Sequence, residues 1–317
     1  MNHRSRTPSP PTPRVVATLL CALALAATSP AAADPPRVLG LAELDRAVSA
    51  SPADVEQRLQ RAEARRRGAR LSEALDDLRI AEALRPGDPQ ITLIRARIAV
   101  DAERWTAARA LLDALLAQRG PHAEALRLRA RVLQQTGDDE GALRDLAAAA
   151  ALGDDVDTHL ARAALLEAHG RVAEAADAVA EGAFATGSAV LYERLAELSA
   201  ALGRFDDALA HLDCARAEGP PDARHLLARA RVLDAAGRPD EARTARLRAR
   251  DDADARLARR TTAFALAERG EARLGLGEHT LGVADLEAAL ALVPRLPAAR
   301  RLLDAATRVT QATGGTR

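Results

Sequence analysis

Three alanines that recur at one interval constrain this chain more than any other feature. Ala74, Ala108 and Ala142 each lie in an amphipathic run, and neighbouring members of the series are 34 residues apart. A fixed interval of this length is typical of arrays of helical hairpins, in which each hairpin buries its apolar face by stacking on the next. No segment shows the period-2 alternation of a half-buried strand. The spacing therefore predicts an all-α chain.

The series of small residues continues at nearly the same interval and predicts about seven hairpins over residues 55–296. Its later members are Ala175, Ala208, Ala242 and Gly282. A glycine precedes the second helix in the later hairpins, where the chain must turn and a left-handed conformation costs a glycine nothing. These predicted turn residues include Gly137, Gly170 and Gly203.

The ends of the array carry partial units. Residues 34–54 place Leu44 and Ala47 where a lone second helix would bury them, so we expect a half-repeat cap there. Residues 297–317 predict a capping helix, from Ala298 to Val309, followed by a disordered tail. Between the sixth and seventh hairpins the interval is six residues too long. The excess contains neither Pro nor Gly, so it favours about one and a half extra helical turns, which either bend the array locally or form a docking site.

These intervals, with proline after the second helix at Pro86, Pro220 and Pro294, resemble the tetratricopeptide repeat family, whose pattern places small residues at positions 8, 20 and 27. The resemblance implies a right-handed α-solenoid of about seven tetratricopeptide-like helical hairpins with a terminal capping helix. It also implies a concave groove lined by first-helix positions 2, 5, 9, 12 and 13, in which a protein or peptide partner binds.

Transferring the groove positions to this sequence gives two charged groups. A basic patch of Arg97, Arg127 and Arg131 is followed by an acidic pair, Glu193 and Glu197. Each group either binds a partner segment of opposite charge or is an ordinary solvated face. The chaperone-binding members of the family use Lys at position 5 and Asn at position 9 of their first repeat, and this chain has neither.

Arginine occupies position 7 of six hairpins, and in three of them Asp occupies position 23. The pairs are Arg61 with Asp77, Arg129 with Asp145, and Arg269 with Asp285. We expect a structural contact within each hairpin, with the guanidinium stem packed on the apolar stripe. Ligand binding by these arginines is the alternative.

The first 33 residues have the features of a signal peptide. Arginines precede an apolar run from Val15 to Ala27, and Ala31–Ala33 offers small residues for cleavage after Ala33. The run is shorter than the roughly 20 residues of a permanent span. Cys21 lies inside it after bulky Leu20, which argues against a lipoprotein signal. We expect an exported protein, periplasmic or extracellular, without an integral membrane segment after cleavage.

No catalytic or metal-binding constellation is present in the sequence. It lacks HExxH, GxSxG and paired CxxC motifs, and its histidines are not spaced for a shared metal. We therefore expect neither catalysis nor a cofactor nor a metal. The formal net charge of zero and the 2% content of aromatic residues argue against nucleic-acid binding.

The sequence thus favours an exported, non-catalytic scaffold for protein–protein interaction, of bacterial origin. A periplasmic chaperone or envelope assembly factor is the first alternative, and an accessory subunit of an enzyme is the second. A scaffold would have one stoichiometric partner, whereas a chaperone would bind many segments weakly.

Overall fold

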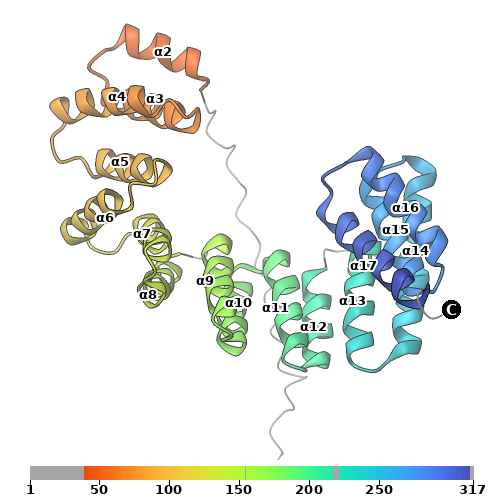
Figure 1. Ribbon diagram of the computed structural model, residues 1–317. Coiled ribbons are helices and arrows are strands. Elements are labelled where there is room, and N and C mark those ends of the chain that lie inside the picture. Colours follow the sequence, from red (N-terminus) through yellow and green to blue (C-terminus); the bar gives the residue numbers. More distant parts are fainter. Residues whose placement is uncertain (1–38, 154, 217–220, 315–317) are drawn as a thin grey trace, which may run out of the picture. The chain divides into compact units, whose positions relative to one another are not determined.

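The regularly spaced small residues lie where paired helices cross. Ala74, Ala108, Ala142 and Ala175 are fully buried, with 0% of their surface exposed. The structure, a computed structural model, describes residues 39–153, 155–216 and 221–314 (Figure 1). Across these ranges it contains sixteen helices and no strand, and fourteen of the helices form seven hairpins, as the sequence predicts. The predicted signal peptide lies outside the described residues.

The chain forms two compact units, which divide between Thr186 and Gly187. The N-terminal unit begins with α2 and continues with four hairpins. Its helices are α2 (Leu41–Ala50), α3 (Val55–Arg67), α4 (Leu71–Leu84), α5 (Pro89–Asp101), α6 (Trp105–Arg119), α7 (Ala123–Gln135), α8 (Asp139–Ala150), α9 (Val156–Ala168) and α10 (Val172–Thr186).

The C-terminal unit contains three hairpins and one further helix. Its helices are α11 (Ala189–Ala201), α12 (Phe205–Ala215), α13 (Ala223–Ala235), α14 (Pro239–Arg259), α15 (Ala263–Gly275), α16 (His279–Leu292) and α17 (Pro297–Gly314). In both units aspartate often caps the first helix of a hairpin. The Asp54, Asp155 and Asp222 side chains each accept a backbone N–H three residues ahead.

Each hydrophobic core extends from one hairpin into the next. In the N-terminal unit Leu59 and Leu78 of the first hairpin pack with Ile91 and Ile98 of the second. In the C-terminal unit Leu212 of α12 packs with Leu233 of α13. Because successive hairpins share a core, each hairpin depends on its neighbours for the burial of its apolar side chains.

The turns between paired helices follow the predicted backbone geometry. Gly137, Gly170 and Gly203 have φ values of 83°, 72° and 74°. The first two hairpins lack this glycine, and Ala69 and Glu103 adopt the same left-handed conformation at φ values of 56° and 54°. A side chain there costs roughly 1–2 kcal/mol.

The inserted residues lengthen a helix, as predicted. Helix α14 has 21 residues, whereas α12 has 11. Ala249 and Ala253 of α14 are fully buried and join the core formed with α13 and α15. The extra turns therefore pack within the array rather than project from it.

Both ends of the array depart in detail from the sequence expectation. In α2 the buried residues are Leu44 and Val48, while Ala47 is half-buried. Helix α17 reaches Gly314, so the prediction of a helix ending at Val309 was wrong. The reason is local, because no helix-breaking residue follows Pro297 until Gly314.

Candidate functional site

A cavity of about 530 Å³ lies among the first helices of the C-terminal unit. We call it the C-terminal groove. Its walls come from α11, α13, α15 and α17, and α12 contributes Leu212. Small side chains make much of the lining, including Ala196, Ala200, Ala228 and Ala298. The space exists because alanine leaves room where a longer side chain would fill the groove.

The charged lining residues occupy the positions that the family resemblance implies. Glu193 and Glu197, the predicted acidic pair, both line the C-terminal groove. The sequence analysis missed the other charged members, which are Arg224, Arg231, Glu271 and Arg301. The groove positions that the family resemblance implies can also be transferred to the sixth and seventh hairpins, and to α17 if it is counted as the first helix of an eighth hairpin. This transfer would have found the four missed residues.

The two glutamates do not form a free acidic surface. Glu193 is ion-paired with Arg224 of the next hairpin, and Glu197 accepts a 2.6 Å hydrogen bond from Arg194 on its own helix. Across the groove, Arg231 lies 3.1 Å from Glu271. Arginines within reach of both carboxylates therefore neutralise them.

Arg301 differs from the other charged lining residues. It is exposed, and no carboxylate pairs with it in the part of the chain that the structure describes. Its neighbour Leu302 is half-buried and holds α17 against α15 and α16. The groove therefore contains one guanidinium that is anchored by its helix and has no partner.

A half-buried histidine completes the wall next to Arg224. The side chain of His225 is 12% exposed, and its Nε2 lies 3.9 Å from Asp213. Burial lowers the pKa of His225 below its usual 6.5, against the opposing charge of Asp213. The pKa of His211, which stacks on Tyr192, is lowered in the same way.

The predicted basic patch lies in the N-terminal unit, and most of its charge is paired. Nη1 of Arg97 is 3.3 Å from Glu63, and Nε of Arg97 donates a 2.8 Å hydrogen bond to Glu124. Arg127 pairs with Asp155. Arg131 alone is exposed with no ion-pair partner in the described chain.

Two arginines of the basic patch, Arg97 and Arg127, are neutralised as the acidic pair is. The carboxylates opposing Arg97 come from the hairpins before and after it, and the one opposing Arg127 comes from the hairpin after it. Burial alone would raise the pKa of Glu63, but hydrogen bonding to Arg66 and the nearby positive charges lower it. The pKa of Asp155 is likewise lowered, because its hydrogen bonds to Thr158 and Arg127 outweigh burial. Both carboxylates therefore stay ionised and keep the arginines neutralised.

The position-7 arginines make the contact expected within their hairpins. Nε and Nη2 of Arg129 both donate to Asp145, at 2.7 Å each. Arg269 holds Asp285 in the same fork, at 2.9 and 2.6 Å. The pKa of Arg129 is raised, and its hydrogen bonds to Asp145 are the largest cause.

Each of these arginines also reaches back to the preceding hairpin, which the sequence analysis did not predict. Nη1 of Arg129 donates to Asp113 at 2.8 Å, and Nη1 of Arg269 donates to Asp254 at 2.8 Å. We call this two-sided contact the arginine clamp. Its sequence signal is an aspartate 15 or 16 residues before the arginine, in addition to the one 16 residues after it.

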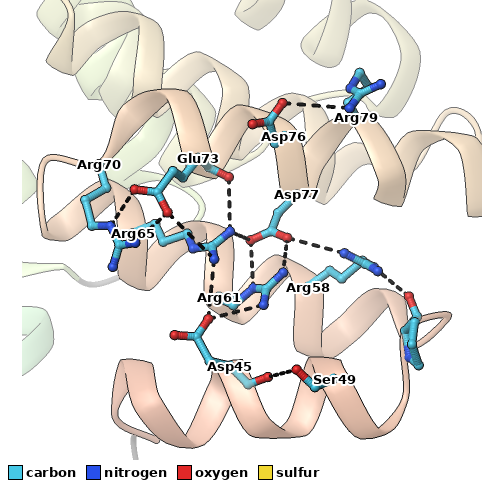
Figure 2. Close-up of polar contacts among 11 residues, drawn as sticks. Asp45, Ser49, Arg58, Arg61, Arg65, Arg70, Glu73, Asp76, Asp77 and Arg79 are labelled. Atoms are coloured by element: carbon cyan, nitrogen blue, oxygen red, sulfur yellow. Dashed lines mark hydrogen bonds and ion pairs between the residues drawn. The ribbon is translucent and has the colours of Figure 1, made fainter.

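The first hairpin has the most elaborate clamp. Figure 2 shows Asp77 between the guanidinium groups of Arg58, Arg61 and Arg65, with Asp45 of α2 on the other side of Arg61. Only 2% of the Asp77 surface is exposed. Asp77 accepts a 2.6 Å hydrogen bond from Arg61 and a 2.7 Å hydrogen bond from Arg65. The clamp therefore fixes the N-terminal cap to the first hairpin.

The described residues show no cluster of His, Cys, Asp and Glu suited to hold a metal ion. Among the described helices, none has both the length and the apolar character to cross a bilayer.

Comparison with known proteins identifies the repeats. A family model described as tetratricopeptide repeat matches residues 95–157 and 194–256. The C-terminal part of a TPR repeat-containing protein from Cytophaga hutchinsonii has a similar crystal structure, with 16% identity and a TM-score of 0.55 over 77% of this chain and 99% of that one. A tetratricopeptide repeat protein from Parabacteroides merdae matches at 16% identity and a TM-score of 0.49, over 80% of this chain and 98% of its own.

No curated protein matches this sequence significantly. The similarity in structure to the Cytophaga protein concerns the fold alone, because identity is 16%. The family model, however, matches the sequence in each of the two units. The chain therefore carries tetratricopeptide repeats over residues 95–157 and 194–256, among its seven helical hairpins.

Proposed function

We propose that this chain is an exported, non-catalytic interaction protein that binds an extended segment of a partner protein in the C-terminal groove. One observation carries the proposal: four successive first helices, α11, α13, α15 and α17, line a single cavity of about 530 Å³. Binding sites in proteins are typically concave, of roughly 300–1,000 Å³, and combine apolar lining with a few placed polar groups.

The lining suits a segment of protein. Alanines along the groove leave space for side chains of the segment, and the charged residues stand on several helices rather than converging on one point. A bound segment would touch three hairpins and α17 together. Such a contact stabilises the array only in its folded form, so binding and stability should be linked.

Blocking the groove tests this proposal directly. Ala298 is exposed and lines the groove, so Ala298→Trp should fill it without disturbing the core. Ala305 is exposed on the same helix but does not line the groove, which makes Ala305→Trp the matched control. Crosslinking in the native cells, followed by mass spectrometry, should recover a partner with the unmodified protein and the control but not with Ala298→Trp. Equal recovery with both variants would place recognition elsewhere.

The same experiment separates a scaffold from a chaperone. A scaffold should recover one partner in a fixed ratio, whereas a periplasmic chaperone should recover many proteins in small amounts. The paired charges of the groove favour the scaffold, because a chaperone for varied clients gains little from fixed ion pairs.

Export rests on the sequence of the first 33 residues. Sequencing the N-terminus of the cellular protein should find Asp34 first. A cellular protein that begins at Met1 would contradict export by cleavage.

A further inference from the structure

We infer that the C-terminal groove selects a segment with an acidic side chain, which Arg301 of α17 receives. This inference rests on the proposed function, since it names the chemistry of the partner at the same groove. It differs from the sequence expectation, in which Glu193 and Glu197 would attract a basic segment.

The carboxylates of the groove are already engaged. Glu193 is paired with Arg224, Glu271 with Arg231, and Glu197 with Arg194. A lysine or arginine of a partner would have to displace an existing guanidinium to gain an ion pair. The groove therefore offers little net attraction to a basic segment.

Arg301 has the opposite character. It lines the groove, is exposed, and pairs with no carboxylate among the described residues. Arginine binds a carboxylate through two parallel N–H···O bonds, and this geometry is stronger and more specific than a single contact. An acidic side chain would gain this interaction without breaking any pair in the protein.

The exposure of the paired side chains adds to the same preference. Arg224 is 69% exposed and Arg231 is 62% exposed, whereas their partners Glu193 and Glu271 are 37% and 21% exposed. In these two pairs the guanidinium group is more exposed than the carboxylate, whereas in the third pair Glu197 is 63% exposed and Arg194 is 33% exposed. A segment that enters the groove therefore meets Arg224 and Arg231 more readily than Glu193 and Glu271.

The groove lining near Arg301 determines which other side chains of the partner segment fit. Ala298 stands one residue after the start of α17 and three residues before Arg301, so it lies one helical turn from the guanidinium. Ala200 and Ala228 are half-buried in the wall. The geometry accommodates an apolar side chain beside the acidic one.

A displayed peptide library provides the test. The probe is a library of ten-residue random peptides fused through their C-termini, so that only side chains supply carboxylates. Peptides are selected on the full chain and counter-selected on Ala298→Trp. We expect the selected sequences to be enriched in Asp and Glu, next to apolar residues.

Variants of α17 then assign the contact. Arg301→Ala should weaken binding of a selected peptide by about tenfold or more, as expected for a hydrogen-bonded charge pair of about 1.5–3 kcal/mol. Arg300 is its exposed neighbour outside the groove lining, so Arg300→Ala should leave affinity unchanged. Arg301→Glu should shift the selected sequences toward Lys and Arg. Circular dichroism should show the same helicity for all three variants, because both arginines are exposed.

The outcomes distinguish this inference from the proposed function. Peptides that depend on the open groove but carry no acidic bias, or that bind Arg301→Ala equally well, would overturn the role of Arg301 and leave the groove as the binding site. If counter-selection on Ala298→Trp removes every peptide that binds the full chain, the groove is not the binding site and both proposals fall.

Discussion

The two units are built from the same kind of hairpin but use the faces of their first helices differently. In the N-terminal unit long charged side chains pair from one hairpin to the next, as in the series Glu63, Arg97 and Glu124. In the C-terminal unit alanines stand among the charged residues and leave a cavity of about 530 Å³. The cavity described in the N-terminal unit, of about 210 Å³, lies instead beside the clamp of Arg129. A common repeat thus sets the helices, while side-chain volume at the groove positions decides whether a ligand has space.

Removing the buried carboxylate of the first clamp should have the largest effect. Asp77→Ala leaves Arg58, Arg61 and Arg65 converging on a site without its anion, and loss of one member of a buried pair costs about 3–5 kcal/mol. Hydrogen exchange of the amides in α3 and α4 should accelerate accordingly. Asp76→Ala is the control, since Asp76 is 69% exposed and should change stability by less than about 0.5 kcal/mol. Equal effects of the two substitutions would show that the clamp does not stabilise the N-terminal unit.

A substitution at the helix crossing of the last hairpin should come next. Gly282 replaces the alanine found at this position in the N-terminal unit, and a Cβ there would lie 2.8 Å from Leu274 Cγ and 3.0 Å from the Gly270 carbonyl oxygen. Gly282→Ala should therefore destabilise the C-terminal unit by about 1–3 kcal/mol, as overpacking does. In an open helix the same change would stabilise by about 1 kcal/mol. The sign of the change in thermal stability therefore tests whether α15 and α16 approach this closely.

The inter-helix turns offer a smaller contrast between the units. Gly203→Ala should cost the C-terminal unit roughly 1–2 kcal/mol, because φ is 74° at this residue. In the N-terminal unit Ala69→Gly should stabilise, by less than about 1 kcal/mol, since glycine relieves strain but loses more entropy on folding. Urea denaturation followed at each unit by hydrogen exchange measures both. A destabilised Ala69→Gly protein would mean that relief of strain is the lesser term.

The smallest effect expected is a dependence on pH confined to the C-terminal unit. Burial lowers the pKa values of His211 and His225 in the folded protein, so the unfolded chain binds protons more readily. Their stabilising contribution is complete above about pH 6.5 and is lost as the pH falls through the lower pKa values of the folded state. Hydrogen exchange in α11 to α13 at several pH values should show this loss. The double variant His211→Gln, His225→Gln should show a flatter profile, and an unchanged profile would assign the loss to other groups.

The fold could be predicted from the sequence because its signals are local. The interval between Ala74 and Ala108 reflects helix length and turn length, and the left-handed turn at Gly203 follows from a single residue type. The fork from Arg129 to Asp145 was predictable for the same reason, as both residues belong to one hairpin.

The electrostatics of the groove could not be predicted in this way. Whether Arg97 is free depends on Glu63 and Glu124, which come from two other hairpins and reach it only through long, flexible side chains. Arg301 was missed for a different reason. A terminal helix was expected to act as a cap, although in the structure it also completes the groove.

The position of α17 has a genetic consequence. The groove takes Ala298, Arg301 and Leu302 from α17, which follows the seventh hairpin and does not belong to any hairpin. A stop codon or frameshift in the codons for α17 would therefore remove one wall of the groove and its unpaired guanidinium, and leave the helices before α17 to be made. Truncations within α17 should behave as losses of recognition rather than losses of protein.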